Sequence, residues 1–527
     1  MEKSLTSSLE KNIKLFQEIF QGDSTIICRR FVSAGNLPLE CCIFYCDGMV
    51  NNQIINENIL RPVTLWERNQ ESTLEDTLKT VLQINEAKQS QDVSSMVRDM
   101  LYGDTLFLCQ GSDRALILNT KGFSMRSIAE PQSEQVLRGP REGFTEGILM
   151  NISMIRRKIR SPYLKFEFSQ VGEETKTTLC ICYVEGVVEP RVLERLRRRL
   201  SKVKIDGVLD SNYVQEFIRD SPRSPFKTVG GTEKPDVVAA CLLEGRVAVL
   251  VDGSPVVLTM PYIFMEQFQS GEDYYVGWHF AAISRLIRLA GFLFAISVVP
   301  AYIALITYHR EMLPAPLLFS ISASREGVPF PTLLEGIGLL IAFEILREAG
   351  ERTPAGFGQT LSIVGGLVLG QAAVEARFIS APMVIVVAFS GITGLMLPRL
   401  KGPVIWCRLG LIFLSAWLGL YGLFVGLLWL LLHLSTLHSF GVPVLRDAAP
   451  GGRGQEDSYF RTDVYKRQEQ DSGYGVIIGY LRSEDFRGQA DRDTRKGEPV
   501  HQKQGLAAGS VPQYRKQGKG LPAKPNP

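Results

Sequence analysis

Apolar residues recur along the first 280 or so residues with the periods of helices and strands. Residues 6–20 place them at every third or fourth position, which predicts an opening helix. Residues 39–50 form an apolar run that ends at the turn signal Asp47-Gly48, which predicts a strand. The same criteria predict helices at 73–87 and 189–202, strands within 103–118 and at 177–185, and a helix, a turn and a hairpin across 237–258.

Strands that alternate with helices at this spacing are typical of α/β or α+β folds. A soluble stretch of about 280 residues exceeds the usual size of one domain. We therefore expect two soluble subdomains, at 1–150 and 151–284, with a boundary that falls between 145 and 170.

A different pattern begins after Arg288. Residues 289–308 carry no charge and are long enough, at about 1.5 Å per residue, to cross a hydrocarbon core of about 30 Å. Pro300 lies inside this segment and is expected to kink it. Further apolar segments lie at 331–347, 360–374, 381–397 and 409–434. Residues 285–443 are therefore predicted to form an all-α, multi-pass transmembrane domain of four to six helices.

The number of crossings stays open within that range. The segments at 331–347 and 360–374 are short or interrupted, which also fits re-entrant or protein-buried helices. Basic residues near the segment ends fit five spans with a cytoplasmic N-terminal region and an outside tail. They are Arg285, Arg288, Arg347, Arg352, Arg399, Lys401 and Arg408.

Composition changes this picture in two ways. The mean hydropathy of +0.05 averages a charged soluble part, an apolar part and a polar tail, and the net charge of +3 gives no case for a nucleic-acid partner. Residues 444–527 are rich in Gly, Gln and charges, so we expect a disordered or artefactual tail. The nine cysteines lie mostly in apolar runs typical of buried strands, and we expect no signal peptide at the N-terminus.

Catalytic patterns are missing from the sequence. It has no phosphate-binding GxxxxGK[ST] loop, no strand-linked GxGxxG, no HExxH and no GxSxG, and its five histidines are scattered. We therefore predict neither an enzyme nor a bound cofactor or metal.

One charged motif stands out in the soluble part. Residues 138–146 combine two arginines, Arg138 and Arg141, with two carboxylates, Glu142 and Glu146, around two glycines. Together with Arg156, this segment can organise a buried charge network or an anion site. A solvated loop is the alternative interpretation.

Carboxylates inside the apolar part form a second candidate site. Glu335 and Glu344 are nine residues apart on one predicted helix, followed by Arg347 and Glu348. A carboxylate at mid-membrane costs about 2.5–3.5 kcal/mol and normally faces a partner or a water-filled path. This pattern predicts a polar, ion-conducting face or an interfacial amphipathic helix. Nearby, Gly366 and Gly370 make a small-residue face, and Gln371 can hydrogen-bond across a helix interface, which fits either close packing or a pore-lining helix.

A series of short motifs in a fixed order resembles the spore germination protein A-subunit family of the GerA type, over about residues 28–443. The motifs include Arg138-Gly139-Pro140-Arg141-Glu142, Ser224-Pro225-Phe226, Thr232-Glu233-Lys234-Pro235-Asp236, His309-Arg310-Glu311-Met312-Leu313-Pro314, Phe343-Glu344-Ile345-Leu346-Arg347-Glu348 and Ser439-Phe440-Gly441-Val442-Pro443. Lys234 departs from the family's usual arginine, and the family pattern is expected to end just after Pro443.

The resemblance implies a subunit of a nutrient germinant receptor in the spore inner membrane. It implies a permease-like B subunit and a lipoprotein C subunit as partners, and a homo-oligomer that forms a germinant-gated ion channel. A non-conducting membrane scaffold, whose soluble part recruits partners, is the alternative function.

Overall fold

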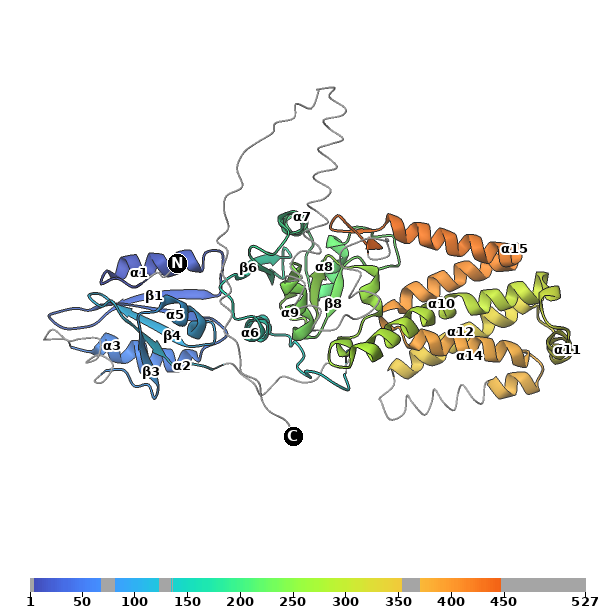
Figure 1. Cartoon of the computed structure of the whole chain (residues 1–527), viewed down its shortest axis with the longest axis horizontal. Helices are drawn as coiled ribbons and strands as arrows, with labels where there is room; N and C mark the ends of the chain where they lie inside the picture. Colours follow the sequence, from blue (N-terminus) through green and yellow to red (C-terminus); the bar gives the residue numbers. More distant parts are fainter. Residues whose placement is uncertain (1–3, 68–80, 123–133, 135, 353–369, 447–527) are drawn as a thin grey trace, which may run out of the picture. The chain divides into compact units, whose positions relative to one another are not determined.

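The computed structural model describes residues 4–67, 81–122, 134, 136–352 and 370–446. Two antiparallel five-stranded sheets, each with its own helices, precede a group of long apolar helices (Figure 1). The fold class is therefore the expected one, an α+β soluble region followed by an all-helical region. The expected opening helix, the strand before Asp47 and the strands within 103–118 are all present.

The first sheet has the strand order β1-β2-β4-β5-β3, and every neighbouring pair is antiparallel. Alternate residues of β2 enter two cores, because side chains of a strand point to opposite faces. Cys42 and Phe44 pack with helices α1 and α5, whereas Cys41 and Ile43 pack with the α2–η1–α3 segment. The elements are α1 (Leu9–Ile19), β1 (Ile26–Val32), β2 (Glu40–Cys46), α2 (Asn52–Ile54), η1 (Ile55–Leu60), α3 (Arg61–Leu65), β3 (Ala87–Ser90), α5 (Val93–Met100), β4 (Thr105–Cys109) and β5 (Ala115–Leu118).

The second sheet has the order β6-β7-β9-β10-β8 and is also antiparallel throughout. Its strands are β6 (Leu164–Val171), β7 (Thr177–Val184), β8 (Gly230–Thr232), β9 (Val247–Val251) and β10 (Val257–Met260). Its helices are α6 (Ile148–Lys158), α7 (Pro190–Leu200), α8 (Ser211–Ile218) and α9 (Pro235–Leu243). Helices α6 and α9 share one core with β6, β7 and β9.

These two units are structural repeats, since their strand orders match and helices occur at the same places between the strands. The same side-chain bonds precede the first helix of each repeat. Asn12 accepts the backbone N–H of Thr6 (2.9 Å) and donates to its carbonyl (2.6 Å), as Asn151 does with Thr145 (2.8 and 2.6 Å). After the fourth strand, the N–H groups of Gly111 and Gly253 donate to Ser7 and Glu146 at 2.9 and 2.8 Å. We refer to the units as repeat 1 and repeat 2.

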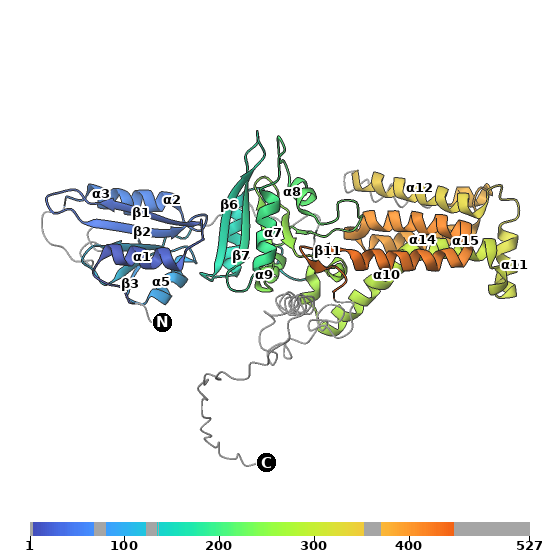
Figure 2. The same cartoon turned by 90° about the horizontal axis from the view of Figure 1, so that it is seen from above.

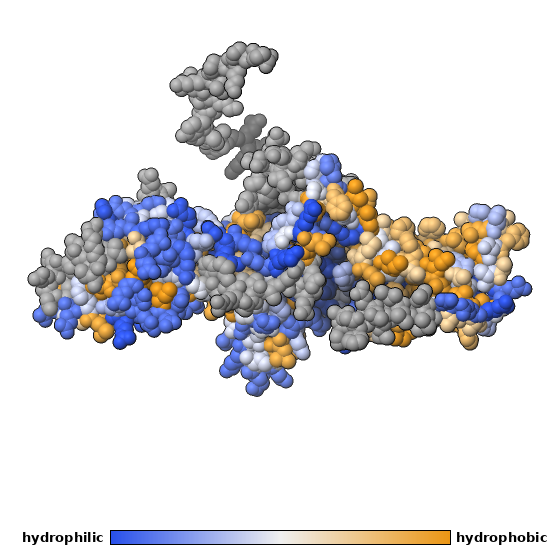
Figure 3. All heavy atoms as spheres, turned by 90° about the horizontal axis from the view of Figure 1, so that it is seen from below, coloured by the Kyte–Doolittle hydropathy of each residue, from blue (hydrophilic) through white to orange (hydrophobic). Residues whose placement is uncertain are grey.

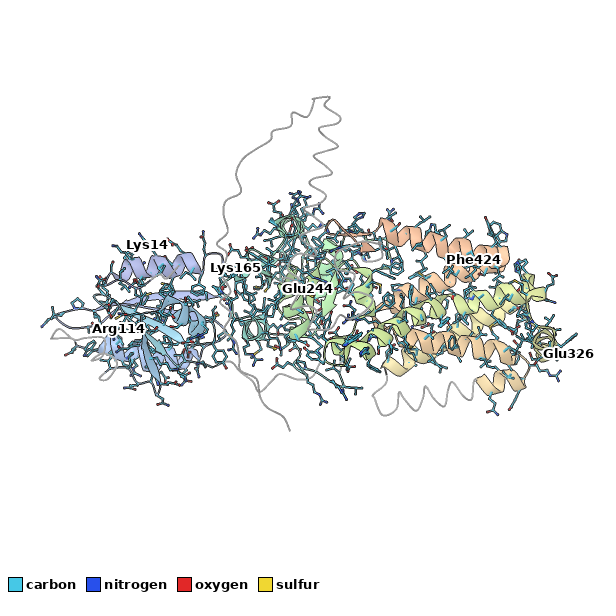
Figure 4. The ribbon with its side chains drawn as sticks, viewed as in Figure 1. Lys14, Arg114, Lys165, Glu244, Glu326 and Phe424 are labelled. Carbon is cyan, nitrogen blue, oxygen red and sulfur yellow. The ribbon has the colours of Figure 1, made fainter. Side chains whose placement is uncertain are left out.

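The helical region follows repeat 2. Two short turns, η2 (Phe264–Phe268) and η3 (Gly271–Tyr274), form the end of repeat 2. The helical region contains α10 (Trp278–Tyr308), α11 (Ala315–Ser324), α12 (Thr332–Arg352), α14 (Ala381–Leu395) and α15 (Lys401–Thr436), with short turns η4 (Arg310–Met312) and η5 (Pro398–Leu400). Helices α10, α12, α14 and α15 lie side by side in both views (Figures 1 and 2). Within the described chain, Trp278–Tyr308 and Pro398–Thr436 are long and apolar enough to cross a membrane. Hydrophobic residues cover much of this region's surface (Figure 3), and Phe424 of α15 is 67% exposed (Figure 4).

Helix α15 is a hairpin of two legs, so the expected single span at 409–434 is wrong. Gly419 breaks the helix with φ 64° and ψ −143°, a conformation that only glycine adopts readily. Gly426 of the second leg lies against Leu411 of the first. The legs, 401–418 and 420–436, are about 27 and 25 Å long at 1.5 Å per residue. Each leg is close to the thickness of a hydrocarbon core.

The chain that leaves α15 returns to repeat 2, which contradicts the five-span layout with an outside tail. Strands β11 (His438–Ser439) and β12 (Val442–Pro443) form a small hairpin. Ser439 donates to the carbonyl of Thr228 at 2.6 Å, and the N–H of Phe264 donates to Val444 at 2.9 Å. Because α10 also starts at repeat 2, the chain enters and leaves the helical region at the same end, and any number of complete crossings must be even.

Some predictions fall partly or wholly outside the described residues. Residues 81–86 of the expected helix at 73–87 are not helical, and residue 87 begins β3 instead. Only residues 370–374 of the segment at 360–374 are described, and they are helical. The expected tail lies outside the described residues beyond 446. Helix α10 runs through Pro300 to Tyr308.

Candidate functional site in the helical region

Glu335, in the first turn of α12, is a buried carboxylate with several partners. Its Oε1 accepts Nη2 of Arg325 at 3.1 Å, and its Oε2 accepts the backbone N–H and the hydroxyl of Ser380 at 3.1 and 2.8 Å. Ser380 is the N-cap of α14. Glu335 therefore joins the starts of α12 and α14 to the turn after α11. Its 0% exposed side chain makes it a lock between helices, because leaving such a group unpaired costs several kcal/mol.

Glu344, two and a half turns further along α12, lies between two arginines. It forms an ion pair with Arg347 on its own helix, and its Oε1 lies 3.7 Å from Nη1 of Arg408. Arg408 is 3% exposed and donates from Nε to the carbonyl of Ala295 in α10 at 3.0 Å. Glu344 and its partners thus link α10, α12 and the first leg of α15. This cluster, which we name the Glu344 triad (Glu344, Arg347 and Arg408), is 24% exposed at its carboxylate.

The remaining helical candidates lie apart from this triad. Glu348 pairs with Arg352 and with Lys401 at the start of α15, 2.7 and 3.2 Å away. Gln371 is exposed and donates to Glu375 at 2.8 Å, one turn along the same helical segment. Gly370 approaches Val384 of α14, whereas Gly366 lies outside the described residues. The structure therefore does not join Gln371 or Gly370 to the Glu344 triad.

Residues 138–146 do not form one charge network with Arg156. Glu142 pairs with Arg157 and Lys158 of α6, at 3.1 and 3.3 Å. Arg138, Arg141 and Glu146 are exposed. The backbone of this segment forms hydrogen bonds with the rest of repeat 2. The N–H of Phe144 donates to the carbonyl of Glu233 at 2.8 Å, and the N–H of Thr145 donates to the side chain of Asn151. The loop alternative accounts for most of this motif.

Arg156 instead joins the two repeats. Its Nη2 donates to Oδ2 of Asp23 at 2.6 Å and to the hydroxyl of Thr25 at 2.9 Å, and its guanidinium lies 4.8 Å from the ring centre of Phe166. Both charged side chains are 0% exposed. The N–H of Ser24 also donates to Phe166 at 3.0 Å. A buried charge pair thus holds repeat 1 against repeat 2.

Several contacts among the described residues attach repeat 2 to the helical region. Arg285 and Arg288 of α10 pair with Asp273 of η3, the first at 3.2 Å. Arg399, between α14 and α15, pairs with Glu134 at 2.5 Å. Further attachments are the β11–β12 hairpin and the hydrogen bond between Ser224 and His433 of α15, 3.0 Å long. From the sequence these arginines were only markers of topology: Glu134 is 265 residues from Arg399, and Asp273 lies outside α10 in a separate turn, so local patterns did not indicate either partner.

A buried ion pair supports these attachments from within repeat 2. Arg246 donates to Glu266 at 2.5 Å, and both side chains are nearly buried. Burial raises the pKa of Glu266 above its ordinary value of 4.5, and Arg246 offsets that effect only in part. The carbonyl of Glu266 also accepts Arg399 at 3.4 Å.

The fold and these contacts define a class: two soluble α+β repeats attached to an apolar helical bundle with buried ion pairs. Within that class, the chain belongs to the family described as Bacillus/Clostridium GerA spore germination protein, whose model matches residues 14–472. The match continues past Pro443, so the expected end of the family pattern was placed too early.

Several relatives cover most of the chain. Spore germination protein KA of Bacillus subtilis (strain 168) is 38% identical over 505 residues, which are 94% of this chain and 93% of that protein. An uncharacterized membrane protein of the same organism, YfkQ, is 38% identical over 462 residues, or 87% and 90% of the two chains. The N-terminal domain of the A subunit of the Bacillus megaterium spore germinant receptor GerK3 is 31% identical, with a TM-score of 0.40, covering 50% of this chain and 98% of that chain.

Proposed function

We propose that this protein is the A subunit of a nutrient germinant receptor in the inner membrane of a bacterial spore. Membership of the GerA family carries this proposal. In this role the subunit converts the sensing of a nutrient into the release of ions, together with a permease-like B subunit and a lipoprotein C subunit.

The proposed layout has an even number of crossings, with both soluble repeats and β11–β12 on the cytoplasmic side. Helices α12 and α14 start at the same end, where Glu335 bonds Ser380. The end of α12 lies near Lys401, whose Nζ is 2.6 Å from Glu351. Both helices therefore run toward repeat 2, and the described crossings of this layout are α10, α12, α14 and the two legs of α15.

The Glu344 triad is our candidate for the polar element of an ion path in a homo-oligomer of this subunit. Two arginines and one carboxylate in an apolar bundle are costly, and such groups normally serve a path or a partner. Glu335 is the less suitable candidate, since its oxygens are already bonded to Arg325 and Ser380.

A deletion experiment tests the receptor role. Removing the gene from a strain without redundant receptors should abolish the spore's response to a nutrient, while germination by a direct chemical trigger persists. An unchanged nutrient response would overturn the proposal.

Ion flux tests the conducting role separately. The full chain, reconstituted with its B and C subunits, should show nutrient-gated flux that Glu344→Gln changes in rate or ion selectivity. Gated flux that persists unchanged in this variant would remove Glu344 from the path. A complete absence of gated flux from the wild-type assembly would favour the non-conducting scaffold.

A further inference from the structure

The charged motif of the soluble part begins in an exposed loop whose function the contacts of Glu142 and Thr145 do not explain. We define the Arg138 loop as residues 136–141. Leu137 is 88% exposed, and Arg138 beside it is exposed as well. Within the part of the chain that the structure describes, the guanidinium of Arg138 has no ion-pair partner. An apolar and a cationic side chain thus project together from one turn.

Contacts of the neighbouring residues hold this loop beside the start of α10. The backbone N–H of Leu137 donates to the carboxylate of Glu272 in η3. A Cβ on Gly139 would lie 2.5 Å from Cδ2 of Tyr275, so the loop can lie against this ring only because residue 139 is glycine. Tyr275 is itself fixed, because its hydroxyl donates to Asp236 at 2.6 Å. It precedes the first residue of α10 by three positions.

The surface of α10 marks where lipid would begin. Its first turns expose Phe280 (65%), Ile283, Leu286 and Ile287, and this apolar surface continues with Leu293 and Phe294. The residues just before and at the helix start expose aromatic rings instead, those of Tyr274, Tyr275 and Trp278. Tyrosine and tryptophan are enriched at the level of lipid headgroups. The Arg138 loop lies against one of these rings and therefore at that level.

Three other basic residues near this level are already neutralised by carboxylates. Arg285 and Arg288 share Asp273, and Arg399 pairs with Glu134, four residues before Arg138. Arg138 is the cation of this group that remains available to solvent. A guanidinium forms forked hydrogen bonds with phosphate oxygens, which zwitterionic and anionic lipids both carry, but an anionic lipid adds net charge attraction.

We propose that the Arg138 loop binds the headgroups of anionic phospholipids in the membrane that α10 enters, and that Leu137 inserts among those headgroups. This inference rests on the membrane location proposed above. It gives the charged motif a role that its internal contacts do not supply: the loop fixes repeat 2 to the membrane surface.

A lipid titration tests the proposal. The full chain in neutral detergent is titrated with dioctanoyl phosphatidylglycerol, and bound lipid is counted by native mass spectrometry. Arg138→Ala should weaken binding about fivefold, the factor that corresponds to about 1 kcal/mol for one basic residue at a membrane surface. Arg138→Lys should keep most of the affinity, since it keeps the charge. Dioctanoyl phosphatidylcholine should bind the wild type and Arg138→Ala about equally.

Arg114 provides a matched control, because it is an exposed arginine in the β4–β5 turn of repeat 1 (Figure 4). Arg114→Ala should leave phosphatidylglycerol binding unchanged. Equal binding of phosphatidylglycerol by the wild type and Arg138→Ala would overturn the inference. It would also be overturned if Arg138→Ala kept its affinity for the lipid but no longer bound a partner subunit. Extraction of cell membranes at alkaline pH tests the membrane location on its own, because a chain released into the supernatant would remove that premise whatever the titration gave.

Discussion

The ion pair between Arg156 and Asp23 is the residue contact whose loss should cost most in the soluble part. Removing one member of a fully buried pair typically costs about 3–5 kcal/mol, because it leaves the other charge unpaired. We expect Asp23→Asn and Arg156→Met to lower the melting temperature of the full chain, measured by scanning fluorimetry in detergent. Arg30→Gln, which breaks an exposed pair with Glu10, should change it little. Equal melting temperatures for all three variants would contradict this account.

Cys28 should be an unusually reactive thiol. The hydrogen bond with Cys42, whose sulfur lies 3.3 Å away, lowers the pKa of Cys28 from 9.0 to about 7, with help from Arg30 and against the effect of burial. The reactive thiolate forms as pH rises through the pKa. Iodoacetamide labelling of Cys28, followed by mass spectrometry, should therefore rise with pH to a plateau with a midpoint near 7.

Two variants check this assignment. Arg30→Gln should move the midpoint upward, and Cys28→Ser should remove the labelled peptide. A wild-type midpoint at the ordinary thiol value of about 8.5 would show that the neighbours do not activate Cys28.

At this scale the sequence identified charged residues but not their partners. Arg156 and Arg157 are adjacent, yet a helix turns about 100° per residue, so Arg156 meets Asp23 of repeat 1 while Arg157 meets Glu142. Likewise Glu335 was recognised as a costly buried acid, but Arg325 and Ser380 were not recognised as its partners. Pairings between distant segments depend on tertiary packing, which local patterns do not contain.

Among the elements, the α15 hairpin depends on one glycine. We expect Gly419→Val to destabilise the helical region, because the backbone there costs about 1–3 kcal/mol for a non-glycine residue and a Cβ would lie 2.7 Å from Cε1 of His309. Thermal aggregation of the full chain in detergent measures the effect. Gly410→Ala in the first leg is the control: its Cβ would meet nothing within 4 Å, so the substitution should be neutral or stabilising. The hairpin is misplaced if both variants behave alike.

The equivalence of the two repeats predicts that matching substitutions in them have similar effects on stability. Asn12 and Asn151 form the same hydrogen bonds before equivalent helices, so alanine at either position should cost a similar amount, about 1–3 kcal/mol, by leaving a backbone carbonyl and N–H unsatisfied. Hydrogen exchange of α1 and α6 reads the two effects separately. An Asn12→Ala variant with normal protection in α1 would contradict the equivalence.

Most elements of repeat 2 and the long helices were predictable, because their apolar periods are strong. The α15 turn was not, since Leu418-Gly419-Leu420 lies within an uninterrupted apolar run and offers no polar turn signal. The duplication was also missed, because the matching positions share hydrogen-bonding roles more than residue identity. Gln110 accepts the N–H of Leu9 at the start of α1 at 2.8 Å, and Asp252 accepts the N–H of Ile148 at the start of α6 at 3.2 Å.

For the whole molecule, the return of the chain to repeat 2 predicts topology. A reporter fused after Arg446 should lie on the same side of the membrane as the N-terminus, so that green fluorescent protein is fluorescent and alkaline phosphatase is inactive. The same reporters inserted between Tyr308 and Ala315 should give the opposite result. Active alkaline phosphatase at the first position would restore an odd number of crossings.

Repeat 2 holds the first and the last of the long helices, through Asp273 and through the β11–β12 hairpin, and it also holds the connection between α14 and α15. The long helices are thus joined through repeat 2 at one end of the bundle. The helices cannot separate at this end without distorting repeat 2. At the opposite end, the described contacts join the helices only to one another, as Glu335 does with Ser380 and Tyr308 with the carbonyl of Ala416. Any opening of the bundle would therefore begin there, farthest from the soluble repeats.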